Sequence, residues 1–388
     1  MTLDPTGAGA APFDEEELAM VARRATGKTI EPGSWAAAAP LAGVVNASST
    51  GGVWRVTAND GSWSVIMKVL QHSAEGHRHW LSGAEPSDPM YWKREALVLT
   101  SDLFAGASGL RPPRCFGAFD GEGDVVRLWL EDVKGVPGAG WDVAGYRLAS
   151  RHLGQMQGRF LAGRPLPREP WLSDGWLRGY VTRRERDLAV PMPPQLWQDP
   201  LVKLAFPENL SDAIAELWDD RHRTLDRLDA SPQTLCHLDY WPKNLFQART
   251  PGGLETIAID WAYAGRGAIG EDVANLVADS LRDFFLLPTE HAEALTENVF
   301  EGYLEGLAEA GASVDRREAR FAFCAAASLK YAWGFSDLFF LAMDKEAQVR
   351  VKERIPFGLN RFYIERGVIQ RHLLRLAKEA RTLAKELG

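Results

Sequence analysis

The stretch from Leu235 to Leu245 reads Leu-Cys-His-Leu-Asp-Tyr-Trp-Pro-Lys-Asn-Leu, and the rest of the chain is best understood by its relation to it. Its polar skeleton is His237, Asp239 and Asn244. Asp239 comes two positions after His237, and Asn244 comes five positions after Asp239. A short loop with this spacing can hold a carboxylate near a hydroxyl nucleophile and an amide oxygen near a metal ion. The stretch therefore indicates phosphoryl-transfer chemistry.

A second carboxylate follows a short apolar run downstream. The run Thr256-Ile257-Ala258-Ile259 has strand character and is followed by Asp260. A carboxylate at a strand's end, just beyond the catalytic loop, is where such a site needs its metal ligand. Far upstream, Lys68 closes another strand pattern, and Glu95 falls on an expected helix between the two. The spacing of His237, Asp239 and Asn244 would be weak evidence by itself. The apolar run with Asp260, together with Lys68 and Glu95, strengthens it.

At these residues the chain resembles the aminoglycoside phosphotransferase and choline kinase-like family. The resemblance spans residues 41–286, and its sharpest parts are His237-x-Asp239-x4-Asn244 and Ile259-Asp260-Trp261. It implies an α+β, two-lobed protein-kinase-like fold, with a small antiparallel-sheet N-lobe and a larger, mainly helical C-lobe. We expect residues 1–40 to form a tail and a helix, residues 41–135 the N-lobe and hinge, and residues 136–388 the C-lobe.

The composition fits a soluble enzyme, which we expect to be cytoplasmic. The chain is 46% hydrophobic and 25% charged, which is ordinary for a globular protein. No apolar run approaches a membrane span, and the N-terminus lacks a basic region followed by an apolar one, so we expect no membrane association. The net charge of −8 disfavours nucleic acid as a partner. Three scattered cysteines argue against a disulfide framework.

The expected N-lobe contains the nucleotide-binding candidates. Lys68 is flanked by apolar residues, so its ammonium group must either reach the surface or meet anions. The loop at residues 46–52 is small and hydroxyl-rich and could cover phosphates, although a plain hairpin loop is the more common structure for such a segment. Residues 71–90 look like an inserted lid or interaction loop, and we expect its histidines to be solvated rather than to bind metal.

The resemblance assigns roles to individual residues. Asp239 would accept or orient the hydroxyl of the substrate. Lys68, held by Glu95, would fix the phosphates of ATP, and main chain from Glu131 to Val133 would bind the base. Asn244 and Asp260 would hold Mg²⁺. Of the neighbouring residues, we expect His237 to brace the loop, Lys243 to be a candidate for extra positive charge, and Asp272 to be a helix N-terminal charge.

The acceptor is predicted to be a small molecule, bound between the catalytic loop and helices of the C-lobe. Its walls would come from residues 171–197 and from the helices after Asp272, whose candidate residues are Asp279, Asp283, Trp333 and Asp337. Carboxylates and indoles together suit a hydroxylated molecule that carries an amine, such as an amino sugar or an aminoglycoside. A neutral sugar is the close alternative.

Two other functions compete with this hypothesis. The chain could be a noncatalytic, kinase-like protein that binds a nucleotide or metabolite, but each polar position that the chemistry requires is present. It could instead phosphorylate protein side chains. The absence of a Gly-x-Gly-x-x-Gly loop and of Asp-Phe-Gly or Ala-Pro-Glu after Asp260 argues against that.

Overall fold

The computed structural model describes residue 13 and residues 15–29, 35–41, 49–72, 82–185, 193–208, 210–282 and 289–388. These residues form two compact units, each assembled from three segments of the chain. Unit 1 consists of Met1–Val136, Pro167–Asp174 and Asn244–Gly265, and unit 2 of Pro137–Leu166, Gly175–Lys243 and Arg266–Gly388. The first segment ends one residue beyond the division that the sequence suggests, and two later segments pack with it.

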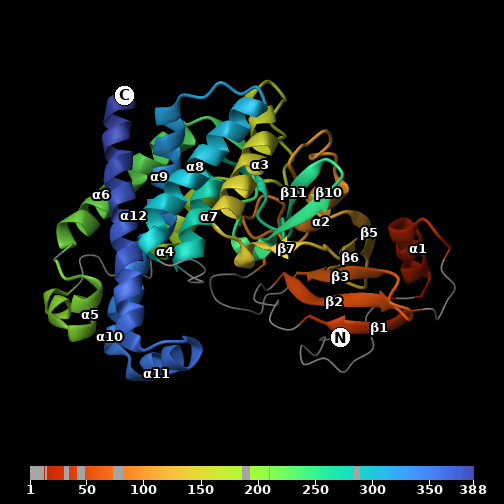
Figure 1. Cartoon of the computed structure of the whole chain (residues 1–388), viewed down its shortest axis with the longest axis horizontal. Coiled ribbons are helices and arrows are strands. Elements are labelled where there is room, and N and C mark those ends of the chain that lie inside the picture. Colours follow the sequence, from red (N-terminus) through yellow and green to blue (C-terminus); the bar gives the residue numbers. More distant parts are fainter. Residues whose placement is uncertain are drawn as a thin grey trace. The chain divides into compact units, whose positions relative to one another are not determined.

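The main feature of unit 1 is a five-stranded antiparallel sheet (Figure 1). Its strands, in spatial order, are β1 (Trp35–Pro40), β2 (Thr50–Ala58), β3 (Ser64–Gln71), β6 (Val125–Glu131) and β5 (Cys115–Asp120). The turn at Asn59-Asp60-Gly61 joins β2 to β3, with Gly61 in the left-handed conformation that this turn favours. The sheet's core is built from β-branched and aromatic side chains that face α1 (Glu15–Thr26).

Two smaller elements of unit 1 carry the expected site residues. The short helix α2 (Arg94–Thr100) contains Glu95. The hairpin of β10 (Leu245–Thr250) and β11 (Gly253–Ala258) ends just before Asp260, and β4 (Leu110–Arg111) lies parallel to β11. The remaining short strands are β7 (Val136–Pro137), β8 (Ser173–Asp174), β9 (Gln233–Cys236) and β12 (Gly265–Ala268).

Unit 2 is mainly helical (Figure 1). Its helices are α3 (Val143–Leu161), α4 (Trp176–Glu185), α5 (Pro200–Ala205), α6 (Ser211–Asp229), α7 (Glu271–Arg282), α8 (Ala292–Glu309), α9 (Arg316–Tyr331), α10 (Gly334–Met343), α11 (Lys345–Arg354) and α12 (Leu359–Leu387). Short 3-10 turns are η1 (Gly138–Gly140), η2 (Pro194–Gln198), η3 (Pro242–Asn244) and η4 (Thr289–His291). Asp142 caps α3 by accepting a hydrogen bond from the Gly145 N–H at 2.9 Å.

Glycines let α3 and α8 approach closely. A Cβ atom at Gly306 of α8 would lie 1.9 Å from the Arg151 carbonyl oxygen, and one at Gly154 of α3 would lie 2.3 Å from the Tyr303 carbonyl oxygen. Only glycine allows this backbone-to-backbone contact. α7 is buried along nearly its whole length, and α9 and α12 pack together beside it. α7 begins with Glu271 and Asp272.

The predicted α+β class, with an antiparallel sheet in the N-terminal part and a mainly helical C-terminal part, is confirmed. Among the described residues, no helix is both long enough and apolar enough to cross a bilayer.

Candidate active site

Lys68 lies on the central strand of the sheet in unit 1, where apolar neighbours bury its stem. Its partners in the two adjoining strands are Val53 of β2 and Leu128 of β6. The residue is 8% exposed. Its ammonium nitrogen Nζ lies 2.6 Å from Oε2 of Glu95 and 2.8 Å from Oδ1 of Asp260. The structure thus brings three of the residues singled out in the sequence into one ion-pair cluster.

The charges in this cluster depend on one another. Burial alone would lower the pKa of Lys68, but the carboxylates of Asp260 and Glu95 outweigh burial and raise that pKa above its ordinary value. Burial raises the pKa of Glu95, and this effect is opposed by Lys68 and by a hydrogen bond from the Trp261 N–H. Lys68 is therefore a cation at neutral pH, fixed beside a buried and a half-exposed carboxylate.

Asp260 occupies a turn that few residues other than glycine adopt. Its φ is +63°, in the left-handed region where aspartate is better tolerated than most residues. Nearby, Leu245 pairs with Ala258 in the β10–β11 hairpin, and the Ile259 N–H donates to the Asn244 carbonyl at 2.8 Å. Asn244 and Asp260 consequently flank the same end of this hairpin.

The donors at this hairpin end suit a hard divalent cation. Asp260 presents a carboxylate that is 41% exposed, and Asn244 is an amide residue. Mg²⁺ in phosphoryl-transfer sites is bound through one or two carboxylates, with phosphates and waters completing its shell. In the part of the chain that is described, no group of three or more His, Cys, Asp or Glu side chains is placed to hold a metal. Asp260 and Asn244 supply only one carboxylate and one amide, so this pair falls outside that definition and is still compatible with Mg²⁺.

Glu131, at the end of β6, has a structural role that its sequence position did not reveal. Its carboxylate pairs with Arg111, at 2.6 Å and 3.0 Å to the two terminal nitrogens, and accepts from the Arg114 N–H at 3.0 Å. The main-chain N–H of Glu131 donates to the Arg114 carbonyl at 2.9 Å. This N–H is thus already used within the protein.

In unit 2, Asp272 anchors the loop that carries the predicted catalytic residue Asp239. This carboxylate accepts hydrogen bonds from the main-chain N–H groups of His237 at 2.8 Å and Leu238 at 2.7 Å. The amide of Gln157 donates to it at 2.8 Å. Leu238 has a φ of +66°, which leucine rarely adopts, so the loop needs this anchor. His237 accepts from the Asp239 N–H at 3.2 Å through Nδ1, as a bracing residue would.

Asp272 lies in the first turn of α7, as the sequence predicts, but its role is not limited to that of a helix-end charge. The residue is 1% exposed, and both of its oxygens are used to hold the loop. Burial raises the pKa of Asp272 to about 6, although the N–H groups of His237 and Leu238 favour the charged form. Asp239, next along the loop, is half-buried. The contacts span about 35 residues of sequence, so no local pattern could have indicated them.

A second polar group below the loop was also missed. Lys330 of α9 donates to the Leu238 carbonyl at 3.4 Å and to the side-chain oxygen of Asn275. Its ammonium group lies 4.6 Å from the ring centroid of Trp176. Lys330 therefore ties the loop to α7 and to the start of α4. Trp176, which lies in the segment 171–197 that was expected to border the acceptor, is 3% exposed and takes part in this packing.

Most of the predicted acceptor residues already have partners. Asp279 is buried and accepts hydrogen bonds from the Tyr331 hydroxyl, at 2.7 Å, and from the Asn275 amide. Trp333 is 1% exposed, and its indole N–H donates to the Leu329 carbonyl, so its ring has no free face for a ligand. Asp283 lies outside the described residues.

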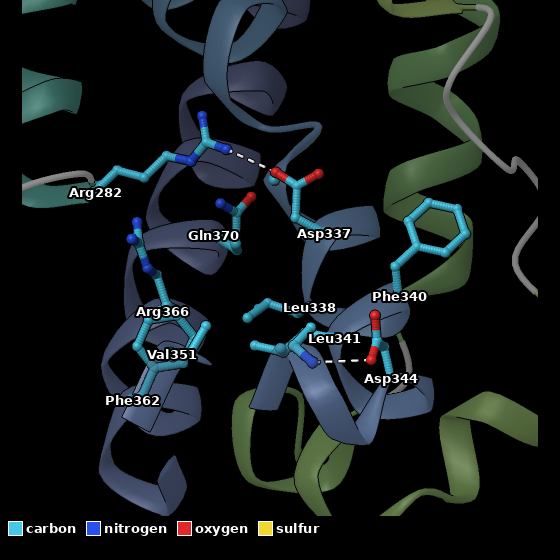
Figure 2. Close-up of a pocket in the computed structure, with 12 residues that line it drawn as sticks. Arg282, Asp337, Leu338, Phe340, Leu341, Asp344, Val351, Phe362, Arg366 and Gln370 are labelled. Atoms are coloured by element: carbon cyan, nitrogen blue, oxygen red, sulfur yellow. Dashed lines mark hydrogen bonds and ion pairs between the residues drawn. The ribbon is translucent and has the colours of Figure 1, made fainter. Parts of the chain in front are cut away.

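Asp337 is the predicted acceptor residue that borders a cavity. The pocket has a volume of about 500 Å³ and is bordered by α10, α11 and α12 and by the end of α7 (Figure 2). Asp337 is 51% exposed and pairs with Arg282 at 3.0 Å and Arg184 at 3.3 Å. Figure 2 shows the amide of Gln370 beside the Arg282–Asp337 pair, with Arg366 further along the same helix. Gln370 is 1% exposed, and its Oε1 has no hydrogen-bond partner among the described residues.

The other aromatic and basic candidates have mainly structural contacts. Trp197, at the end of the segment 171–197, packs edge-on against Phe339, with ring centroids 4.9 Å apart. Lys243 is exposed, and its ammonium group lies 5.4 Å from the ring centroid of Trp241.

The family model and the solved structures that match this chain are those of phosphotransferases and kinases. A family model described as the phosphotransferase enzyme family matches residues 104–319, which is more than half of the chain. The search of curated proteins found no match. Among solved structures, an amicoumacin kinase in complex with AMP-PNP, Ca²⁺ and Ami is 13% identical with a TM-score of 0.53, and the match covers 94% of each chain. This likeness confirms the predicted kinase-like fold.

Two further solved structures are more distant. A spectinomycin phosphotransferase in complex with ADP and spectinomycin is 13% identical, with a TM-score of 0.46, and the match covers 95% of this chain and 100% of that one. A choline kinase from Cryptosporidium parvum Iowa II is also 13% identical with a TM-score of 0.46, over 90% of this chain and 99% of that one.

Proposed function

The chain belongs to the phosphotransferase enzyme family, and from that premise we propose that it transfers the γ-phosphoryl group of ATP, with Mg²⁺, to a hydroxyl group of a sugar-like small molecule. The observation that carries this proposal is the cluster of Lys68, Glu95 and Asp260, in which a buried ammonium group is held by two carboxylates. Phosphoryl transfer depends mainly on positioning and charge stabilisation, and this cluster supplies both.

Each residue then has a defined task. Asp239 accepts or orients the acceptor hydroxyl, on a loop that Asp272 holds through two N–H groups. Lys68 pairs with phosphate oxygens, and Glu95 keeps its ammonium group in place. Asn244 and Asp260 hold the metal. Bound Mg²⁺ would neutralise charge that develops on the phosphate oxygens.

We place the body of the acceptor in the pocket of α10, α11 and α12. Its volume of about 500 Å³ lies within the range of small-molecule sites. The buried Oε1 of Gln370 supplies an acceptor for a donor group such as a hydroxyl. Arg282 lies ten residues after Asp272 on α7, which corresponds to about 15 Å along the helix axis. The acceptor must therefore be elongated to reach from this pocket to the catalytic loop.

Within that class we propose an amino sugar, an aminoglycoside or a related aminocyclitol. The supporting groups are the carboxylates of Asp337 and Asp344, which border the pocket and are 51% and 52% exposed. An ammonium group on the acceptor would pair with them. Arg282 and Arg366 border the same pocket, so a neutral sugar is the competing acceptor.

The test is a turnover screen with ATP and Mg²⁺ across matched aminated and hydroxylated acceptors, at low and high salt. An aminated acceptor should be preferred, and its KM should rise as salt screens the charge. Asp337→Asn should raise that KM without changing the KM for ATP. Glu346→Gln is the matched control, because Glu346 is 92% exposed on α11.

The same screen distinguishes the competing functions. If neutral sugars are turned over equally well and salt has no effect, the proposal that the acceptor carries an amine is wrong. The kinase assignment would stand. Phosphorylation of a protein mixture instead of small molecules would identify a protein side-chain kinase. Nucleotide binding without turnover of any acceptor would indicate a noncatalytic binding protein.

A further inference from the structure

Arg94 is the most completely enclosed charged residue of unit 1 among those described. It is 0% exposed, and its guanidinium group faces main-chain carbonyl groups. Nε donates to the Trp171 carbonyl at 2.6 Å, Nη1 to the Pro89 and Ala262 carbonyls at 2.9 Å and 3.0 Å, and Nη2 to the Asp88 carbonyl at 2.5 Å. Burial lowers the pKa of Arg94 to about 10, so the group is still charged at neutral pH.

The four carbonyl groups come from three separate parts of the chain. Asp88 and Pro89 belong to a compact loop that precedes α2 and is closed by hydrogen bonds between Gly83 and Met90 and between Trp92 and Gly83. Trp171 lies in the short segment 167–174. Ala262 comes two residues after Asp260. Arg94 thus joins the start of α2 to the turn that presents the predicted metal ligand.

The next residue, Glu95, contacts the same turn. Its carboxylate pairs with Lys68 and accepts from the Trp261 N–H. Arg94 and Glu95 together therefore hold both the N–H of Trp261 and the carbonyl of Ala262. The turn needs such support, because Asp260 has a φ of +63° and a conformation of this kind persists only when its surroundings fix it.

We propose that Arg94 is a positioning residue that locks α2 and the Asp260 turn together, so that Lys68, Glu95 and Asp260 are assembled before nucleotide binds. The proposal rests on the proposed nucleotide role of this cluster. It implies that α2 does not swing to switch the enzyme on. The proposal also assigns a structural role to residues 82–92, because the carbonyl groups of Asp88 and Pro89 in this loop bind Arg94.

Arginine is the residue type that this site requires. Its planar guanidinium group carries five N–H donors in fixed directions, and four carbonyl groups are met here from different sides. A lysine would keep the charge but present its donors from a single point. Arg94→Lys is therefore the sharpest substitution, because it changes geometry and leaves charge unchanged.

Lys93→Met provides the matched control. Lys93 is the N-cap residue of α2, next to Arg94, but it pairs with the exposed Asp120 at the surface. We expect Arg94→Lys to raise the KM for ATP by about tenfold or more and to lower kcat, whereas Lys93→Met stays near wild type. If Arg94 acts through its neighbour, the effects of Arg94→Lys and Glu95→Gln on kcat/KM should not add in the double variant. Additive losses, or wild-type kinetics in folded Arg94→Lys, would overturn the proposal.

Hydrogen exchange of the wild-type protein tests the lock without any variant. The amides of residues 82–92, 167–174 and 260–264 should be protected without nucleotide, and AMP-PNP with Mg²⁺ should add little. Rapid exchange that becomes slow only with AMP-PNP would overturn the lock and leave the kinase assignment standing. If the wild-type protein shows no turnover, the proposed function is wrong. The hydrogen-exchange result would still show whether Arg94 holds α2 and the Asp260 turn together without nucleotide.

Discussion

The carboxylate of Asp272 accepts a hydrogen bond from the main-chain N–H of Leu238 at 2.7 Å, and Leu238 has a φ of +66°. A leucine in the left-handed region stores conformational strain, which the surrounding structure must offset. Asp272 does so from within the most buried helix of unit 2, because its other oxygen accepts from the His237 N–H. The position of Asp239, one residue further on, thus depends on a side chain that need not touch a substrate.

Asp272→Asn tests this dependence. Two N–H groups meet two carboxylate oxygens, but an asparagine has one oxygen, so its NH₂ group would face a donor. We expect kcat to fall by roughly ten- to a hundredfold while the KM for ATP changes little. Steady-state kinetics on the folded variant, verified by circular dichroism, provide the measurement. Glu271→Gln, at the preceding position, is the control and should keep its turnover. Normal turnover in folded Asp272→Asn would show that the loop does not need this anchor.

Asp239→Asn tests the proposed catalytic residue itself. Because asparagine is close in shape, folding and ATP affinity should stay near wild type. Loss of a carboxylate that accepts or orients the hydroxyl should reduce turnover by about two to four orders of magnitude. Turnover and ATP titration on the same preparation separate the two effects. Retained turnover would remove Asp239 from the mechanism.

The sequence predicts much of this site because many of its signals are local. Lys68 interrupts an apolar strand, and Asp260 ends another, so strand periodicity places each at a recognisable position. The ion pair of Lys68 with Glu95 is present even though residues 71–90 lengthen the connection between them. These positions follow from element type and order, which the sequence carries strongly.

Other features depend on contacts that no local pattern carries. Arg94 binds main-chain carbonyl groups. Because every residue has such a group, the residue types of its partners do not indicate the contact. Trp333 and Trp176 are buried by segments that lie elsewhere in the sequence. The helical pattern around each residue does not indicate which segment packs against it. Asp337 could be singled out as a carboxylate, but its arginine partners come from α4 and α7.

The metal prediction compares Asp260→Asn with Asn244→Ala. Asparagine tolerates the left-handed conformation of Asp260, so the substitution removes charge without forcing the turn to move. Both variants should bind ATP more weakly than wild type when Mg²⁺ is present, and Asp260→Asn should show the larger loss because a carboxylate suits a hard cation better than an amide. Titrations with and without Mg²⁺ provide the measurement. If Mg²⁺ strengthens ATP binding equally in wild type and both variants, the two residues do not hold the metal.

Glu271→Gln gives a prediction for stability as a function of pH. Burial, and then the neighbouring Asp272, raise the pKa of Glu271 from 4.5 to about 8. Between these values the folded protein keeps a proton that the unfolded chain has released, so this side chain's contribution to stability falls as pH rises from about 4.5 to about 8. Glutamine does not titrate, and its amide oxygen can still accept from the Ala268 N–H. Urea unfolding should therefore show similar stability for the variant and wild type near pH 5, and a variant more stable by a few kcal/mol near pH 8.5, at about 1.4 kcal/mol per pKa unit. Glu346→Gln, at the exposed surface, should show no such divergence. A difference between Glu271→Gln and wild type that is the same at both pH values would mean that Glu271 does not titrate in this range.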